Sequence, residues 1–260
     1  MSMSRKPVVG IVVASAVAAL VISRLWAADP PAVAKVVNFA PVEDLSAQID
    51  YYIDQIGQSL AQKDDYTSAK KSKVRKQAST LAALAMNVGL HDQSHPRKAH
   101  AAVLLQGARA LATSAEDYDR ASKSLAEIKA SLTADPVGTV PIERKPAASL
   151  SALMKQVPVI NSSIKRGAKD AKRFKRQSAE VAQQAATLGA IAQAAMFDTH
   201  EVKKAEDTPK WLQFSAEMRD AAGALNTAAH AADHARATLA IQRMSKSCDA
   251  CHEVFRKEEH

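Results

Sequence analysis

The chain has 260 residues, of which 47% are hydrophobic but only 4% are aromatic. Its 35 lysines and arginines against 27 acidic residues give a formal charge of +8, which favours anionic partners or membrane surfaces. Nucleic acid is disfavoured as a partner because the basic stretches hold few aromatic side chains for base stacking. Strand patterns are almost absent and helical periodicity is widespread, so the sequence predicts an all-α protein.

The N-terminus has the layout of a secretory signal. Arg5 and Lys6 precede an apolar run from Pro7 to Ile22, and small residues follow near Ala27. Residues 1–28 therefore predict a signal peptide or an uncleaved N-terminal anchor, although the run is shorter than the roughly 20 residues that a spanning helix needs. Because either segment leads the chain out of the cytoplasm, we expect a periplasmic location.

Residues 42–134 predict a four-helix bundle. Four stretches place apolar residues three and four apart, which is typical of helices that pack nearly parallel. These stretches are Leu45–Ile56, Val74–Val88, Ala101–Leu111 and Ala121–Leu132. Prolines and a glycine then mark residues 135–146 as a linker.

Residues 147–257 predict a second bundle of the same kind. Its apolar stripes are Leu150–Ile164, Val181–Ala195, Trp211–Ala228 and Ile241–Phe255. Gly167, Pro209 and Asp233 fall where helices should begin or end. Pro158 should either kink the first helix or shift its start.

The two halves share short fragments. Leu45-Ser46-Ala47 matches Leu150-Ser151-Ala152, and Asp119 aligns with Asp233. We therefore expect a duplication that produced two tandem four-helix bundles.

Both cysteines lie in one pentapeptide, Cys248-Asp249-Ala250-Cys251-His252. This C-x-x-C-H spacing is the attachment signature of c-type haem, in which two thiols one helical turn apart bond the haem and the adjacent histidine ligates the iron. A zinc site would need further ligands, and a disulfide would leave His252 without a role. The motif therefore predicts one haem c per chain, held by Cys248 and Cys251, with His252 pointing into the second bundle. The first bundle has no such motif and is expected to be haem-free.

Residues 147–257 resemble the cytochrome c′/c556 family. The matching features are Met154-Lys155 in the first helix, Trp211 at the start of the third, and the block from Cys248 to Arg256 in the fourth. The resemblance implies a haem inside an antiparallel bundle, with His252 as the proximal iron ligand and with Arg256 and Trp211 in the haem environment. A typical member is a single bundle, so the haem-free first half departs from the family.

Two adjacent residues compete for the distal face of the iron. The family presents either Met or Leu there: Met sulfur completes a six-coordinate iron suited to electron transfer, whereas Leu leaves an open site for small gases such as NO. The spacing of the apolar stripe favours Leu153, and the Met-Lys match favours Met154. We therefore expect an electron carrier, with a five-coordinate gas-binding haem protein as the alternative.

Other features carry weaker expectations. A non-catalytic interaction protein is a third alternative, and an enzyme is disfavoured because no acid–base pair stands out. The expected partners are redox proteins, including acidic ones. The sequence leaves a homo-oligomer open, and membrane contact is expected only through the N-terminal segment.

The basic run at 165–176 is interpreted as a solvated helix face. The alternative is a docking patch for an acidic redox partner. Five further histidines are interpreted as surface or loop residues; they are His91, His95, His100, His230 and His234.

Overall fold

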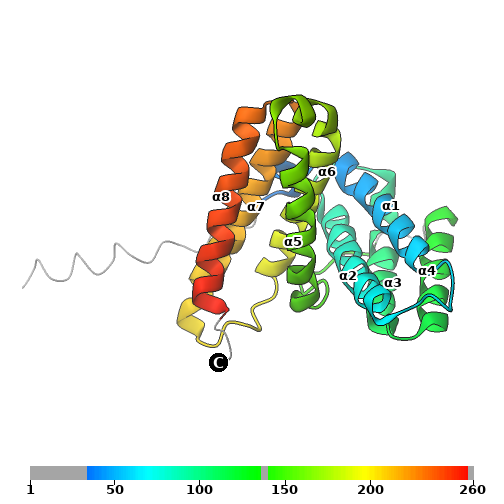
Figure 1. Ribbon diagram of the computed structural model, residues 1–260. Helices are drawn as coiled ribbons and strands as arrows, with labels where there is room; N and C mark the ends of the chain where they lie inside the picture. The colour runs from blue at the N-terminus through cyan, green and yellow to red at the C-terminus, as the bar shows by residue number, and fades with distance from the viewer. Residues whose placement is uncertain (1–33, 136–139, 257–260) are drawn as a thin grey trace, which may run out of the picture. The chain divides into compact units, whose positions relative to one another are not determined.

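The computed structural model describes residues 34–135 and 140–256, and it contains only helices and irregular segments in these ranges (Figure 1). The predicted all-α class is confirmed. The α-helices are α1 Val42–Ser59, α2 Ser68–Leu90, α3 Ala101–Ser114, α4 Tyr118–Thr133, α5 Leu150–Gly167, α6 Ala171–Met196, α7 Thr208–His230 and α8 His234–Phe255. Short 3-10 helices are η2 Val36–Asn38, η3 Pro96–His100 and η4 Ala205–Asp207. The predicted signal or anchor, part of the linker and residue 257 lie outside the described residues.

Predicted helix boundaries in the second half are confirmed. α5 ends at Gly167, where an added Cβ would lie 2.9 Å from Val181 Cγ2. Pro209 stands in the first turn of α7, where its missing N–H costs no helical hydrogen bond. Asp233 caps α8, because its carboxylate accepts the backbone N–H of Arg236 at 3.0 Å.

Pro158 lies inside α5 and does not shift the start of the helix. The helix begins after Ser149, whose hydroxyl accepts the N–H of Ala152 at 3.4 Å. Proline has no N–H, so the carbonyl of Met154, four residues earlier, loses its usual helical donor.

The helices of the first half close on one another. α1, α2, α3 and α4 pack in sequence, and α4 returns to contact α1. At this last contact a Cβ added to Gly57 of α1 would lie 3.5 Å from Lys129 Nζ of α4. Tyr118 at the start of α4 also donates its hydroxyl to the carbonyl of Leu60 at 2.9 Å, which joins the ends of the two helices.

The second half repeats this order without the same closure. α5 packs on α6, α6 on α7 and α7 on α8, but α5 and α8, both within the described ranges, scarcely touch. The fully buried residues of α8 are Ala237, Ala240, Met244 and Ser247. A neighbouring flank, which carries Ile241, Ser245 and Cys248, is only half-buried.

The residues before α1 lock the two halves together. Phe39 is 3% exposed and fills a slot on α6 and α7. A Cβ added to Gly189 would lie 2.9 Å from the Phe39 ring, and one added to Gly223 would lie 2.9 Å from Phe39 Cα. Because a larger residue at either position would collide with it, the two glycines make the slot.

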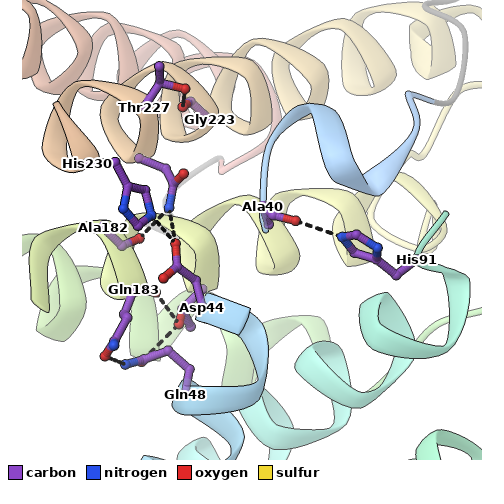
Figure 2. Close-up of polar contacts among 11 residues, drawn as sticks. Ala40, Asp44, Gln48, His91, Ala182, Gln183, Gly223, Thr227 and His230 are labelled. Atoms are coloured by element: carbon purple, nitrogen blue, oxygen red, sulfur yellow. Dashed lines mark hydrogen bonds and ion pairs between the residues drawn. The ribbon is translucent and has the colours of Figure 1, made fainter. Parts of the chain in front are cut away.

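Polar contacts cross the same joint (Figure 2). The Asp44 carboxylate on α1 accepts Asn226 Nδ2 at 2.6 Å and meets His230 Nε2 at 2.8 Å, both on α7. Gln48 of α1 accepts the hydroxyl of Thr187 on α6 at 3.0 Å. One hydrophobic core also extends across both halves. The eight helices therefore belong to one compact unit.

The described part of the linker is docked on the first half. Arg109 of α3 donates to the carbonyls of Pro146 and Ala147 at 2.7 and 2.8 Å. Ile142 packs beside Gly89 and Ala101. None of the helices in the described ranges has both the length and the apolar character needed to cross a bilayer.

Candidate functional site

A small apolar cluster lies at the end of the second half where α8 finishes. Its buried centre consists of Leu150 of α5, Ala195 of α6 and Trp211 of α7. The half-buried side chains packed around this centre are Met154, Val202, Leu212, Cys251 and Phe255. This α8-end cluster therefore brings together Met154, Trp211 and Cys251, which the sequence analysis had singled out separately.

Trp211 is held from two directions. Its indole N–H donates to the carbonyl of Ala195 at 2.9 Å. The ring of Phe255 meets it edge to face, with ring centroids 5.1 Å apart. Such a pair contributes about 1 kcal/mol beyond its buried area, so the tryptophan ties the start of α7 to the ends of α6 and α8.

The loop before α7 supplies residues that the sequence analysis missed. Val202 packs on the α8-end cluster, but it lies in an irregular segment whose sequence has no helical period. Nearby, the buried carboxylate of Asp198 accepts the Nδ1 hydrogen of His200. This hydrogen bond is the main cause that raises the pKa of His200 from its ordinary 6.5.

Cys248 and Cys251 are free, half-buried and one turn apart on α8. Burial is the main cause that raises the pKa of both thiols, that of Cys251 to about 11. For Cys248 the positive charge of Lys165 on α5 offsets part of this increase, although the pKa of the thiol stays raised. Both thiols are therefore protonated at neutral pH, which slows oxidation and disulfide exchange because these reactions need the thiolate.

His252 is exposed, which corrects the expectation that its ring points into the bundle. The buried stripe of α8 passes through Met244 and Ser247, and at helical spacing it continues to Cys251. The next residue lies roughly 100° further round the helix, so His252 lies on the side of α8 that carries Cys248 and is more exposed than Cys248. The backbone of His252 takes part in the hydrogen bonds of α8, and its carbonyl accepts the N–H of Arg256, whereas its imidazole makes no hydrogen bond with another described residue. The imidazole nitrogens are thus available to a ligand.

The structure separates the two candidates for the distal face. Leu153 is 1% exposed and belongs to the main core. Met154 is half-buried and contacts both the main core and the α8-end cluster. Helical spacing places Asn161 on the same flank as Met154, and Asn161 Oδ1 is buried without a hydrogen-bond partner among the described residues. A thioether and an unpaired amide oxygen on one flank suit a bound group with polar and metal functions better than a purely apolar interior.

Arg256 and His91, which the sequence analysis also named, lie outside the α8-end cluster. Arg256 is exposed at the end of α8. His91 is buried and bonded to the carbonyl of Ala40 at 3.0 Å, so it fixes the segment before α1 to the end of α2 and does not lie on a loop surface. Residues 34–135 and 140–256 contain no group of three or more His, Cys, Asp or Glu placed to hold a metal ion. A haem iron needs only one or two protein ligands, so this finding leaves a haem site open.

Comparison of the chain with protein-family models, curated proteins and solved structures gives no match.

Proposed function

We propose that the chain is an exported c-type cytochrome of two tandem four-helix bundles, which carries one haem on the second bundle and transfers electrons in the periplasm. The observation that supports this most is the position of the C-x-x-C-H motif on α8. Its second cysteine shares the α8-end cluster with Met154 and Trp211. The half-buried flanks of α5 and α8, which scarcely touch, leave the two thiols accessible to a flat apolar ligand.

Cys248 and Cys251 attach the haem in this proposal. Each S–H would add across one vinyl C=C bond of the haem, with sulfur bonded to one carbon and hydrogen to the other, so no leaving group and no oxidant would be required. The bound haem supplies an iron that alternates between ferrous and ferric states. Trp211 and Phe255, which pack beside Cys251, would exclude water from the side of the haem attached there.

His252 and Met154 would ligate the haem iron in this proposal. His252 offers an imidazole nitrogen from the same flank as Cys248. Met154 offers a thioether from α5, and thioether ligation raises the reduction potential of the iron. Leu153 is disfavoured at the distal face because its side chain is already committed to the main core.

Attachment is tested by the intact mass of protein matured in a host with haem-ligation machinery. The wild-type polypeptide should carry one haem, and the Cys248→Ala, Cys251→Ala double variant should carry none. A His252→Ala variant should keep the covalent haem but change its spectrum, because attachment and ligation use different residues. A wild-type mass without porphyrin would refute the proposal.

Axial ligation is tested by optical spectra. The ferric wild type should be low-spin, and Met154→Leu should convert it to a high-spin species whose ferrous form binds CO. Met218→Leu is the matched control, because Met218 is buried in the main core on α7 and should leave the spectrum unchanged. A high-spin wild type that binds NO without substitution would favour the gas-binding alternative over electron transfer.

A further inference from the structure

The turn between α5 and α6 concentrates positive charge. Seven cationic side chains lie within residues 165–176, and all are exposed: Lys165, Arg166, Lys169, Lys172, Arg173, Lys175 and Arg176. None of them forms an ion pair with a described carboxylate. The nearby acids have other roles: Asp170 caps α6 by accepting the backbone N–H of Arg173 at 2.8 Å, and Glu180 accepts Gln184 Nε2 at 2.9 Å. We call these seven residues the basic turn.

The basic turn is fixed to the rest of the second half. Phe174, between its cations, is fully buried, and its ring packs against His234 with centroids 5.6 Å apart. His234 Nε2 also meets the carbonyl of Ala168 at 2.8 Å. The cations therefore project from a rigid base formed by α6 and the start of α8.

A polar hollow of about 230 Å³ opens within this surface. Arg166 and Arg173 line it together with Ser163, Gln177 and Gln184, and Glu180 is also in its lining. Two guanidinium groups beside hydroxyl and amide donors are suited to a phosphate group.

We propose that the basic turn docks the protein on an anionic lipid surface. Clusters of four to eight lysines and arginines bind anionic headgroups by charge alone. Tight protein interfaces instead need aromatic or apolar anchors, and residues 163–184 expose no large hydrophobic side chain. These features favour phosphate headgroups over an acidic protein face as the ligand of the basic turn. The protein would then have a second membrane contact besides the predicted N-terminal segment.

Docking through the basic turn would leave the α8-end cluster away from the membrane. From Arg176 to Ala195, α6 rises about 28 Å. Figure 1 shows the α5–α6 turn and the end of α8 at opposite ends of the second half. A partner could therefore approach Cys251 and its surroundings while the protein is bound to lipid.

The start of α2 provides an internal comparison. It also carries a basic run, with Lys70, Lys73 and Lys76 at the same three-residue spacing as Lys169, Lys172 and Lys175. There, however, Glu116 pairs with Arg75 at 2.5 Å and lies 4.0 Å from Lys71. The α2 run is thus partly neutralised within the protein, whereas the basic turn is not.

The test is co-sedimentation of the full-length holoprotein with vesicles of phosphatidylcholine alone or of phosphatidylcholine and phosphatidylglycerol in equal parts. Binding through an apolar N-terminal segment would be common to both vesicles, so the measured quantity is the difference between them. Lys169→Gln, Lys172→Gln, Lys175→Gln should reduce the preference for anionic vesicles about fivefold per cation and roughly 100-fold in total at low salt. The preference should also fall steeply as salt rises.

The control triple variant, Lys70→Gln, Lys73→Gln, Lys76→Gln, loses the same net charge and should retain most of the preference. Lysine and glutamine have similar helix propensities, so both variants should fold, which circular dichroism checks. Equal losses in the two triple variants would overturn the proposal, because net charge alone would then explain binding. Absence of any preference for anionic vesicles in the wild type would also overturn it and would leave an acidic protein as the occupant. Neither outcome bears on haem attachment.

Discussion

The two halves of the molecule use the same order of helices and finish differently. In the first half α4 returns to α1, and Lys129 and Leu125 of α4 lie beside Gly57 of α1. In the second half α8 stops short of α5, and matching Leu45-Ser46-Ala47 to Leu150-Ser151-Ala152 places the exposed Ser162 where the first half has Gly57. The half-buried flanks that result carry Cys248 and Met154. The first half brings its first and last helices into contact, whereas the second half leaves the flanks of α5 and α8 half-buried.

Core truncations should give the largest contrast between the halves. Leu104→Ala, at a fully buried position of α3, should lower the free energy of unfolding by about 2–5 kcal/mol whether or not haem is attached. Leu150→Ala, in the small α8-end cluster, should cost less in the Cys248→Ala, Cys251→Ala background and more in the holoprotein, where haem would bury the site further. Denaturant unfolding of both variants in both backgrounds measures this, and an equal cost for Leu150→Ala in the two backgrounds would contradict the comparison.

Weakening the joint should show how far the halves depend on each other. Asp44→Ala removes the acceptor for Asn226 and His230 and should cost about 1–3 kcal/mol. Unfolding followed by circular dichroism and by haem absorbance should coincide in the wild type and separate in the variant. Asp50→Ala, which removes an exposed partner of Arg97, is the control and should keep the transitions together. Coincident transitions in Asp44→Ala would show that the shared apolar core alone couples the halves.

Single hydrogen bonds allow a finer comparison. Trp211→Phe in the second half and Tyr66→Phe in the first each remove one donor to a backbone carbonyl, that of Ala195 and that of Ala115. Tyr66→Phe should cost about 0.5–1.5 kcal/mol, and Trp211→Phe should cost more because it also removes part of a buried ring. Only Trp211→Phe should also change the haem absorption spectrum, and an equal spectral change in Tyr66→Phe would argue against a haem beside Trp211.

A change of pH should produce the smallest effect. The Asp198 carboxylate raises the pKa of His200 above 6.5, so the stabilisation from this contact is fully present below pH 6.5 and is lost as the pH rises through the raised value. Because His200 is largely exposed, the change in stability should be small. NMR titration of its ring should give a pKa above 6.5 that falls in Asp198→Asn. An unchanged value in the variant would exclude the carboxylate as the cause.

The sequence predicted the helices because their apolar residues repeat at the helical period. The stripe from Leu45 to Ile56 is buried as expected, and Gly167 and Asp233 mark the ends that their chemistry implies. The joint could not be predicted, because Phe39 precedes the first periodic stretch and its slot depends on two glycines far along the chain. Periodicity within one helix carries no information about a partner from the other half.

The structure differs from the sequence-based expectation in the orientation of one candidate site residue, because His252 is exposed. The C-x-x-C-H spacing predicts Cys248, Cys251 and His252 as haem-binding residues from the sequence alone, and this stays a prediction. The predicted seam through Ile241, Cys248 and His252 lies on the flank of α8, because small residues such as Ala237 and Ala240 form the stripe that is actually buried. In an alanine-rich helix, the size of the side chains does not distinguish the face that is buried from the face beside it. The buried stripe expected from the sequence can therefore be wrong by one residue position.

The slot for Phe39 also constrains the order in which the molecule can assemble. Its walls are Gly189 and Gly223, which the ribosome adds long after residue 39 has emerged. The segment before α1 must therefore wait undocked until α6 and α7 have formed, and contacts so distant in sequence slow folding. A chain that ends before α7 should leave Phe39 exposed to proteases, which makes cleavage near this residue a direct report on whether synthesis and folding have reached completion.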